Sequence, residues 1–243
     1  MRDYKKEFEE RVAFVKNLVK ESGANGIVYG NSGGKDCALV GIICKAACEN
    51  TVGVMMPCHT KRNYAEDIAD ATALMEQFGI EGRKVDLTDT RTALINAVSP
   101  STPLNQSATL NIAPRLRMTT LYSIAAAENR LVAGSGNRSE AYVGYFTKWG
   151  DGAYDFNVIS DLNVEEIYDF LRYLKAPQSI IDKAPSAALE EGQTDESEMG
   201  VSYAELDAYM DGGEIAPEKK AKIDALHKKS AHKRNPIPVF KRI

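Results

Sequence analysis

The sequence lacks the features that would place the protein in a membrane, outside the cell or on a nucleic acid. None of its apolar runs approaches the ~20 residues that are needed to span a bilayer. The N-terminus is charged and is not followed by an apolar core, so we expect no signal peptide. A net charge of −4 offers no polycationic field to a nucleic-acid backbone. These absences predict a cytoplasmic protein with neither a nucleic-acid nor a membrane partner.

Cysteine is also scarce, with only four residues: Cys37, Cys44, Cys48 and Cys58. Three of them fall on one expected helix, in a spacing that suits packing better than a disulfide framework. Cys58 precedes His59, but no second pair at zinc-ligand spacing accompanies them. We therefore expect small buried hydrophobes, with Cys37 set apart by its place beside a glycine-rich loop.

Apolar and polar residues alternate in a pattern that predicts an α/β protein. The chain length suits one large domain, 1–243, better than two small ones. Strand and helix patterns alternate at a spacing that implies right-handed crossovers, and hence a doubly wound parallel sheet with helices on both faces. The acidic stretch 190–198 has no apolar periodicity and is expected to be a mobile loop of the kind that forms lids. We expect strands at 27–29, 51–56, 83–87 and 131–133, helices at 8–22, 38–47, 64–78, 88–98, 114–129 and 164–174, and a helical segment from about 200 to 243 with helices at 202–210 and 217–232.

A glycine-rich loop follows the first expected strand and precedes a helix, which places it on the ligand-binding edge of such a sheet. Its paired glycines let backbone N–H groups approach an anion closely, and the helix directs its positive end to the same place. The loop is not the Walker pattern, because no Gly-Lys-Ser/Thr closes it. We predict a phosphate cradle made of Gly30, Asn31, Ser32, Gly33, Gly34, Lys35, Asp36 and Cys37.

Several segments, taken together, resemble one enzyme family. Residues 32–36 are similar to the Ser-Gly-Gly-x-Asp pyrophosphate loop of the N-type ATP pyrophosphatases. Residues 111–118 and 134–140 are similar to the Asn-x-x-Ala-Arg-x-Arg-Met and Gly-Thr-x-Asn-x-Ser-Glu stretches of NAD synthetases. Residues 144–155 resemble their Gly-Tyr-Phe-Thr-Lys-Tyr-Gly-Asp-Gly-x-x-Asp segment most closely. With shorter matches near 193 and 232, the resemblance spans about residues 25 to 235, in family order.

The resemblance implies a Rossmann-like fold of the adenine nucleotide alpha hydrolase type and the last step of NAD biosynthesis. The nicotinate carboxylate of deamido-NAD attacks the α-phosphorus of ATP, giving an adenylate and pyrophosphate. Ammonia then attacks the activated carbonyl and releases AMP and NAD. Positioning and charge neutralisation carry such chemistry. The resemblance also implies Mg²⁺ and a homodimer whose interface completes the substrate site.

Site residues follow from the positions that match the family's motifs. Asp36 and Glu140 are hard oxygen ligands that suit Mg²⁺ bound jointly with phosphates. An isolated charged residue would also fit a solvated surface, so the assignment depends on the joint pattern. The basic cluster from His227 to Arg234 is such a case, although a small phosphate-bearing ligand would suit it. The resemblance implies ATP contacts for Ser135 and Ser186, and deamido-NAD contacts for Arg115, Lys148, Asp155, His232 and Lys233.

The chain departs from the family pattern at three positions. Cys37 replaces the serine that ends the loop, and a thiol is larger, oxidisable and a poorer donor. Val164 stands where the family has an ATP-contacting lysine, so one charge is missing. Lys35 is uncommon in the variable loop position and is our candidate to compensate, so Lys35→Ala should raise the KM for ATP. Ser135 replaces a threonine but keeps the hydroxyl.

The sequence leaves two other functions open. One is a related ATP pyrophosphatase, either tRNA-thiolating or similar to GMP synthetase; the acidic balance and the lack of a dimerisation domain with a purine-nucleotide pattern argue against it. The other is a non-catalytic nucleotide-binding regulatory module, which leaves Glu140, Lys148 and Asp155 without a role. The loop begins about thirty residues in, so we expect no glutaminase domain and ammonia as the direct donor, with a separate glutaminase in trans left open.

Overall fold

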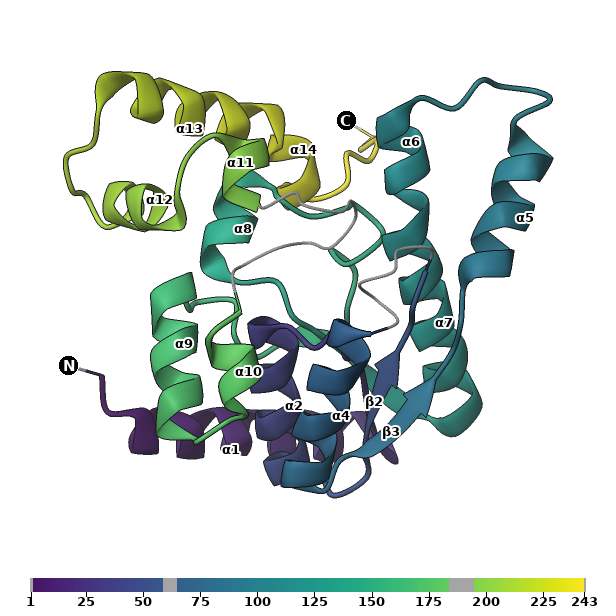
Figure 1. Ribbon diagram of the computed structural model, residues 1–243, viewed down its shortest axis with the longest axis vertical. Helices are drawn as coiled ribbons and strands as arrows, with labels where there is room; N and C mark the ends of the chain where they lie inside the picture. Colours follow the sequence, from purple (N-terminus) through teal and green to yellow (C-terminus); the bar gives the residue numbers. More distant parts are fainter. Residues whose placement is uncertain (1, 59–64, 184–194, 243) are drawn as a thin grey trace.

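The computed structural model describes residues 2–58, 65–183 and 195–242. Its centre is a five-stranded sheet in the order β3-β2-β1-β4-β5, and every neighbouring pair of strands is parallel. The sheet confirms the predicted α/β fold (Figure 1). Its strands are β1 (Gly26–Gly30), β2 (Thr51–Met55), β3 (Glu81–Lys84), β4 (Arg130–Gly134) and β5 (Phe156–Asn157).

Helices cover both faces of the sheet, because successive side chains of each buried strand point to opposite faces. On β1, Ile27 and Tyr29 belong to one apolar cluster with the helices of one face, while Val28 belongs to a second cluster with α7. The helices around the first cluster are α1 (Tyr4–Ser22), α2 (Lys35–Ala47), α4 (Glu66–Phe78), α9 (Val164–Tyr173) and α10 (Gln178–Ile181). On the other face lie α5 (Thr88–Val98), α6 (Gln106–Leu110) and α7 (Ile112–Glu128).

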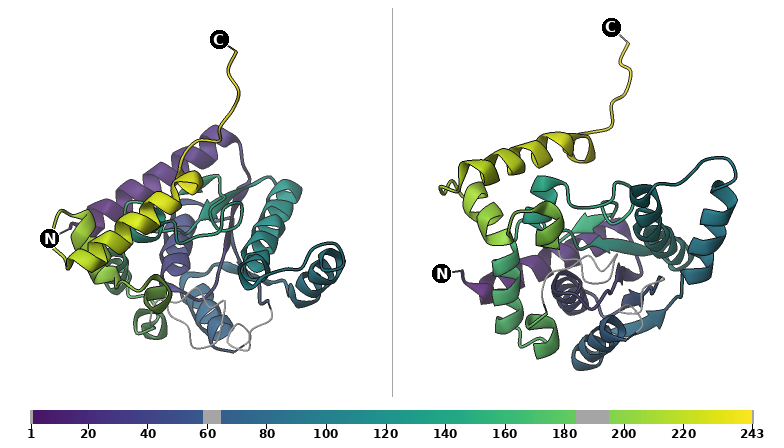
Figure 2. Two further views of the ribbon diagram at one scale, coloured as in Figure 1. Left: turned by 90° about the horizontal axis from the view of Figure 1, so that it is seen from above. Right: turned by 45° about the horizontal axis from the view of Figure 1, so that its top comes forward.

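The C-terminal helices form a third, smaller apolar cluster beside the sheet. It contains Val143, Val164, Tyr203, Leu206 and Ile223, all buried. These helices stand above the edge of the sheet at which the strands end, and the tail after them extends away from the body (Figure 2). They are α8 (Arg138–Val143), α11 (Asp195–Met199), α12 (Tyr203–Met210) and α13 (Pro217–Lys229), and the short α14 (Ala231–Arg234) follows α13 without contributing a residue to the cluster.

The predicted elements are present, with corrections where local patterns are weak. The third strand spans Glu81–Lys84 rather than 83–87, and none of its four residues is buried, so no apolar alternation marked it. Part of the acidic stretch predicted as a loop is the short helix α11, and 184–194 lies outside the described residues. The last predicted helix is two helices, α13 and α14. Four helices and one strand were not predicted: α6, α8, α10, α11 and β5.

The four cysteines are free, as predicted. Cys37, Cys44 and Cys58 are buried and Cys48 is half-buried. His59, beside Cys58, lies outside the described residues. Among the described helices, none combines the length and apolar content needed to cross a bilayer.

Candidate active site

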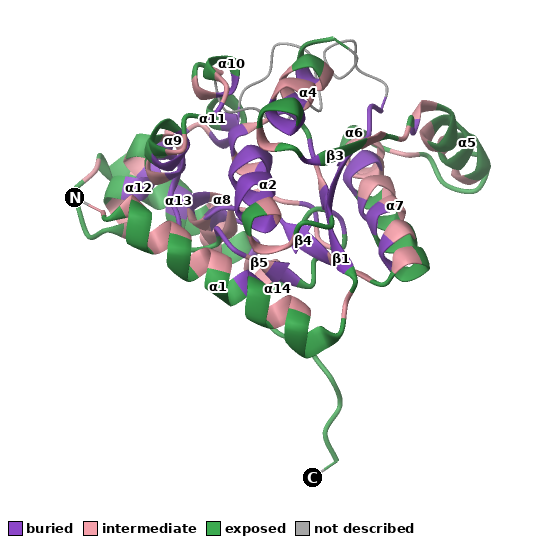
Figure 3. Cartoon of the chain, turned by 90° about the horizontal axis from the view of Figure 1, so that it is seen from below, coloured by how far each residue is buried: buried purple, intermediate pink, exposed green. Residues whose placement is uncertain are grey.

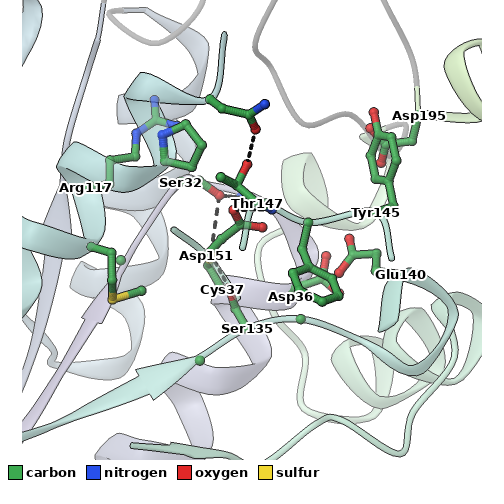
Figure 4. Close-up of a pocket in the computed structure, with 18 of the residues that line it drawn as sticks. Ser32, Asp36, Cys37, Arg117, Ser135, Glu140, Tyr145, Thr147, Asp151 and Asp195 are labelled. Atoms are coloured by element: carbon green, nitrogen blue, oxygen red, sulfur yellow. Dashed lines mark hydrogen bonds between the residues drawn. The ribbon is translucent and has the colours of Figure 1, made fainter. Parts of the chain in front are cut away.

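A cavity of about 630 Å³ opens at the carboxyl ends of β1, β2 and β4. The strand order reverses between β1 and β4, because crossovers from β1 lead outward to β2 and β3 while β4 lies on its other side. Ligands bind at such a switch point in doubly wound sheets. The cavity is therefore where the sequence predicts nucleotide binding, and its wall carries side chains from both glycine-rich loops (Figure 4).

The first loop is a backbone cradle at the end of β1. Gly33 has φ of +72°, and a Cβ there would come within 2.4 Å of the carbonyl oxygen of Asp67, so only glycine fits. The buried Asn31 holds the turn, since its Oδ1 accepts the Gly33 N–H at 3.2 Å. Gly34 is the N-cap of α2 and supplies no side-chain cap. The first turn of α2 thus directs its N–H groups and the positive helix end into the cavity.

Cys37 joins the two glycine-rich loops. Its Sγ accepts a hydrogen bond from Ser32 Oγ at 3.3 Å and donates one to Ser135 Oγ at 3.7 Å. Ser135 follows β4, which pairs with β1, so the two hydroxyls face the cavity from adjacent strand ends. Of the predicted ATP-contacting positions in the described chain, all but Gly33 line this cavity, whereas Ser186 lies outside the described residues.

Asp36 and Glu140 are held together by Asn137. The Asn137 side chain donates to Asp36 Oδ1 at 3.1 Å, and its backbone N–H donates to Glu140 Oε2 at 3.0 Å. Asn137 Oδ1 in turn accepts the Glu140 N–H at 2.9 Å, which completes a capping box at the start of α8. Burial, and then the charge of Asp36, raise the pKa of Glu140 well above its usual range. The two predicted metal ligands are therefore brought to one point of the cavity wall.

Lys35 turns toward these carboxylates. Its side chain is only 6% exposed, and its Nζ lies 2.7 Å from Asp36 Oδ2. The ammonium also lies 5.9 Å from the ring centre of Tyr168 and 5.8 Å from that of Tyr203. Burial alone would lower the pKa of Lys35, but the charges of Asp36 and Glu140 outweigh it and raise the pKa above its usual value. Lys35 is thus charged and paired within the site.

The segment 144–155 forms the opposite wall, and its first residues, 144–147, are held by hydrogen bonds to α7 and α14. Thr147 is buried, and its Oγ1 donates to Asn111 Oδ1 at 2.6 Å at the start of α7. Lys233 Nζ, on α14, donates to the carbonyl oxygens of Gly144 (2.6 Å) and Phe146 (2.5 Å). Burial lowers the pKa of Lys233. Lys233 and His232 line the cavity, and Lys233 also anchors this wall, while their assignment to deamido-NAD stays a prediction.

The Arg-x-Arg pair of α7 divides between two environments. Residues two apart on a helix point in different directions, so only one of the two can face the cavity. That residue is Arg117, whose Nε donates to the Met56 carbonyl oxygen at 3.1 Å, and burial lowers its pKa. Arg115, the predicted substrate contact, is exposed and lies 3.4 Å from the carbonyl oxygen of Lys148. The sequence indicated the pair but not which member faces inward.

The remaining predicted substrate residues lie with Arg115 outside this cavity. Lys148 Nζ donates to the His232 carbonyl oxygen at 2.7 Å and lies 5.4 Å from the Trp149 ring centre. Asp155 accepts from Tyr122 Oη at 3.0 Å and from the Val132 N–H at 2.8 Å. Their assignment to deamido-NAD stays a prediction. We call this surface the outer rim: Arg115, Tyr122, Lys148, Trp149, Tyr154 and Asp155. Trp149 is 58% exposed and Tyr154 40%.

The cavity also contains acidic and aromatic side chains to which the sequence motifs assign no role. On α11, Asp195 Oδ2 accepts from Tyr203 Oη at 2.9 Å and Glu198 Oε2 from Tyr145 Oη at 2.6 Å. Asp151 lies in the 144–155 wall (Figure 4). These residues lie inside or beside the segments that resemble the family's motifs, and that resemblance is the sequence signal by which they could be predicted. Val164 is buried in the third apolar cluster instead of lining the cavity.

Comparison with known proteins places the whole chain in one group. The family model described as NAD synthase matches residues 7–237. An NH(3)-dependent NAD(+) synthetase of Carboxydothermus hydrogenoformans is 42% identical over 235 residues, 96% of each chain. An NMN synthetase from Francisella tularensis superposes with a TM-score of 0.94 at 32% identity, covering all of both chains. An NH3-dependent NAD synthetase from Campylobacter jejuni gives 0.83 at 30% identity, covering 99% and 100%.

Proposed function

This chain belongs to the NAD synthase family, and we propose that the residues of its switch-point cavity carry the family's reaction in the roles described below. That reaction is the ATP-dependent amidation of deamido-NAD with ammonia, through an adenylated intermediate, to give NAD, AMP and pyrophosphate. The observation that supports these roles best is the placement of the phosphate cradle, Asp36 and Glu140 at one point of a single cavity.

In the adenylation step, the cradle binds the phosphates of ATP. A nicotinate carboxylate oxygen attacks the α-phosphorus, and the bond from that phosphorus to the bridging oxygen of pyrophosphate breaks. Negative charge then collects on the pyrophosphate. The N–H groups of the first turn of α2 lie where they stabilise that charge, and the Ser32 and Ser135 hydroxyls lie beside them.

Mg²⁺ fits the residues at this point. Asp36 and Glu140 supply two carboxylates at the edge of the cradle, and Mg²⁺ commonly takes one or two carboxylates together with phosphate oxygens. No group of three or more His, Cys, Asp or Glu side chains in the described chain is arranged to hold a metal ion. When bound, Mg²⁺ would neutralise charge on the phosphates.

In the second step, the ammonia nitrogen attacks the acyl carbon of the adenylate, AMP leaves with the acyl oxygen, and the nitrogen loses a proton. Arg117 is partly buried and lines the cavity. Because a guanidinium group binds anionic oxygens well, its role would be to hold an anionic oxygen of the substrate. The 144–155 wall, anchored by Thr147 and Lys233, excludes water from one side of the intermediate.

A second copy of the chain would complete the site at the outer rim. The rim exposes Trp149, Tyr154 and Tyr122 beside the predicted substrate residues, and exposed aromatic side chains are enriched at protein interfaces. Helix α5 has no buried residue, and Figure 3 shows it projecting from the body beside α7. A homodimer that covers this face would enclose the AMP half of deamido-NAD between two copies.

The residue roles are tested by separating the two steps. Given ATP, Mg²⁺ and deamido-NAD without ammonium, the protein should release about one pyrophosphate per site and then stop. Adding ammonium should release AMP and NAD in equal amounts, and glutamine should not replace ammonium. No NAD with either nitrogen source would overturn the proposal, and pyrophosphate release that does not need deamido-NAD would overturn the roles given to the cavity.

Nicotinate mononucleotide is a second candidate substrate. The cavity within one chain contains none of Arg115, Lys148 and Asp155, and the Francisella protein that superposes over the whole chain is an NMN synthetase. The reacting nicotinate carboxylate is the same in both substrates. The ratio of kcat/KM for the dinucleotide and the mononucleotide decides between them.

A further inference from the structure

Lys35 is a buried lysine in a site that is expected to bind a divalent cation, and this combination needs an explanation. Lysine side chains are almost never fully buried unless they are paired. Here the partner is Asp36, at 2.7 Å, and the ammonium lies over the rings of Tyr168 on α9 and Tyr203 on α12, 5.9 and 5.8 Å from their centres. The pairing is therefore enclosed on several sides.

A positive charge beside the two carboxylates stabilises their ionised forms whether or not a metal is present. Asn137 holds Asp36 and Glu140 close together through its side chain and its backbone, and like charges at short range in a partly buried site are costly unless they are neutralised. Lys35 is the ammonium that the described chain places in direct contact with the pair, through Asp36.

Both oxygens of Asp36 already have partners, and the two partners differ in freedom. Oδ1 accepts from the Asn137 amide, which is fixed at its other end because it caps α8. Oδ2 accepts from Lys35. The lysine side chain has four rotatable bonds and can withdraw without uncapping a helix. A divalent cation at Asp36 would repel the ammonium strongly at this distance.

We propose that the ammonium of Lys35 is the resident counter-cation of the Asp36–Glu140 pair, and that a divalent cation must displace it from Asp36 in order to bind. The inference rests on the assignment of Asp36 and Glu140 as metal ligands. It predicts that Lys35 weakens metal binding to the free protein while it stabilises the protein without metal.

The test is Mn²⁺ binding to the full chain without nucleotide, followed by the electron spin resonance signal of free Mn²⁺, because carboxylate sites that suit Mg²⁺ also suit Mn²⁺. Lys35→Met should bind Mn²⁺ at least about tenfold more tightly than the unchanged protein, and Lys35→Arg should bind it like the unchanged protein. Lys183→Met is the matched control. Lys183 lines the same cavity, but it pairs with Asp67 at 2.8 Å and Asp70 at 2.7 Å, so its loss should change the affinity less than about twofold.

Glu140→Gln separates failure of this proposal from failure of the metal assignment. Glutamine preserves the capping box, so the variant should fold and bind Mn²⁺ at least about tenfold more weakly. If Glu140→Gln weakens binding and Lys35→Met leaves it unchanged, the resident-cation proposal is wrong while the metal site stands. If Glu140→Gln has no effect, the metal assignment itself is wrong.

The temperature of thermal unfolding, measured with and without Mn²⁺, gives a second readout that does not depend on the electron spin resonance signal. Without metal, Lys35→Met should unfold at a lower temperature than the unchanged protein, because the carboxylates lose their counter-charge. Mn²⁺ should raise its unfolding temperature by more than it raises that of the unchanged protein. Equal Mn²⁺-induced shifts in the two proteins would overturn the proposal.

Discussion

The two ends of the site differ in how completely one chain builds them. At the phosphate end, formed by residues 30–37, Ser135 and Glu140, the polar groups contact one another and the loop is fixed by buried Asn31 and by Gly33. At the outer rim, Arg115 and the aromatic side chains are exposed, and Arg115 and Lys148 contact backbone oxygens. Binding a small, highly charged group requires rigid donors in place beforehand, whereas binding the rest of a long substrate can be left to an exposed surface, where we propose that a second copy of the chain binds.

Removing the carboxylate of Glu140, which we propose as a metal ligand, should have the largest effect on the rate. Glu140→Gln should lower kcat by about a thousandfold or more, because it removes a ligand that acts on the transferring phosphoryl group. Steady-state NAD formation measures it.

The matched control is Glu205→Gln. Glu205 completes the same kind of capping box at the start of α12 but lies away from the cavity, so kcat should stay within about twofold. If both variants keep full activity, the phosphate end does not work as described.

Introducing a charged side chain at the outer rim should have the next largest effect. Trp149→Glu should dissociate the expected dimer and lower kcat/KM for deamido-NAD by about a hundredfold, because a charge in the centre of an interface is costly to bury. Analytical ultracentrifugation gives the mass and a coupled assay gives the rate.

Phe14→Glu serves as the control, since Phe14 is an exposed aromatic residue (48%) on α1, which packs against α2 on the other side of the sheet. It should change neither mass nor rate. A Trp149→Glu protein with the mass of the unchanged protein would show that the rim is not an interface.

Arg115→Ala should distinguish the substrates. If the rim binds the AMP half, the KM for deamido-NAD should rise by about tenfold, as expected for losing one charge-assisted phosphate contact, while the KM for nicotinate mononucleotide stays the same. Arg172→Ala, at an exposed arginine of α9, should affect neither. Equal changes with the two substrates would place Arg115 near the nicotinate end instead.

Cys37→Ser should have the smallest effect. A hydroxyl can replace the thiol between Ser32 and Ser135, but its shorter bond leaves the 3.7 Å contact longer, so the KM for ATP should change by less than about threefold. Steady-state kinetics measures it. A loss of more than about thirtyfold would mean that the larger sulfur atom sets the width of the cradle.

Local sequence patterns predicted most of the fold. The periodic helices α1, α2, α4, α7, α9 and α12 and the buried strands β1, β2 and β4 agree with expectation to within a few residues, because apolar spacing reports which face is buried. Helix α5 also agrees in position, but none of its residues is buried. The errors fall on elements too short to show a period, such as the two-residue β5 and the five-residue α6. They also fall on the edge strand β3, whose residues are not buried.

What the sequence by itself determined is the phosphate loop, the parallel sheet and the family to which the motifs point, since each depends on residues that are neighbours in the chain. Tertiary structure decided the rest. It placed Arg117 rather than Arg115 in the cavity, turned Lys35 toward Asp36, and left the outer rim exposed. The physical reason is that the direction and charge partners of a side chain depend on elements far away in the sequence. Lys35 comes near Tyr168 of α9 and Tyr203 of α12 only in the folded chain, in which α9 packs against α2.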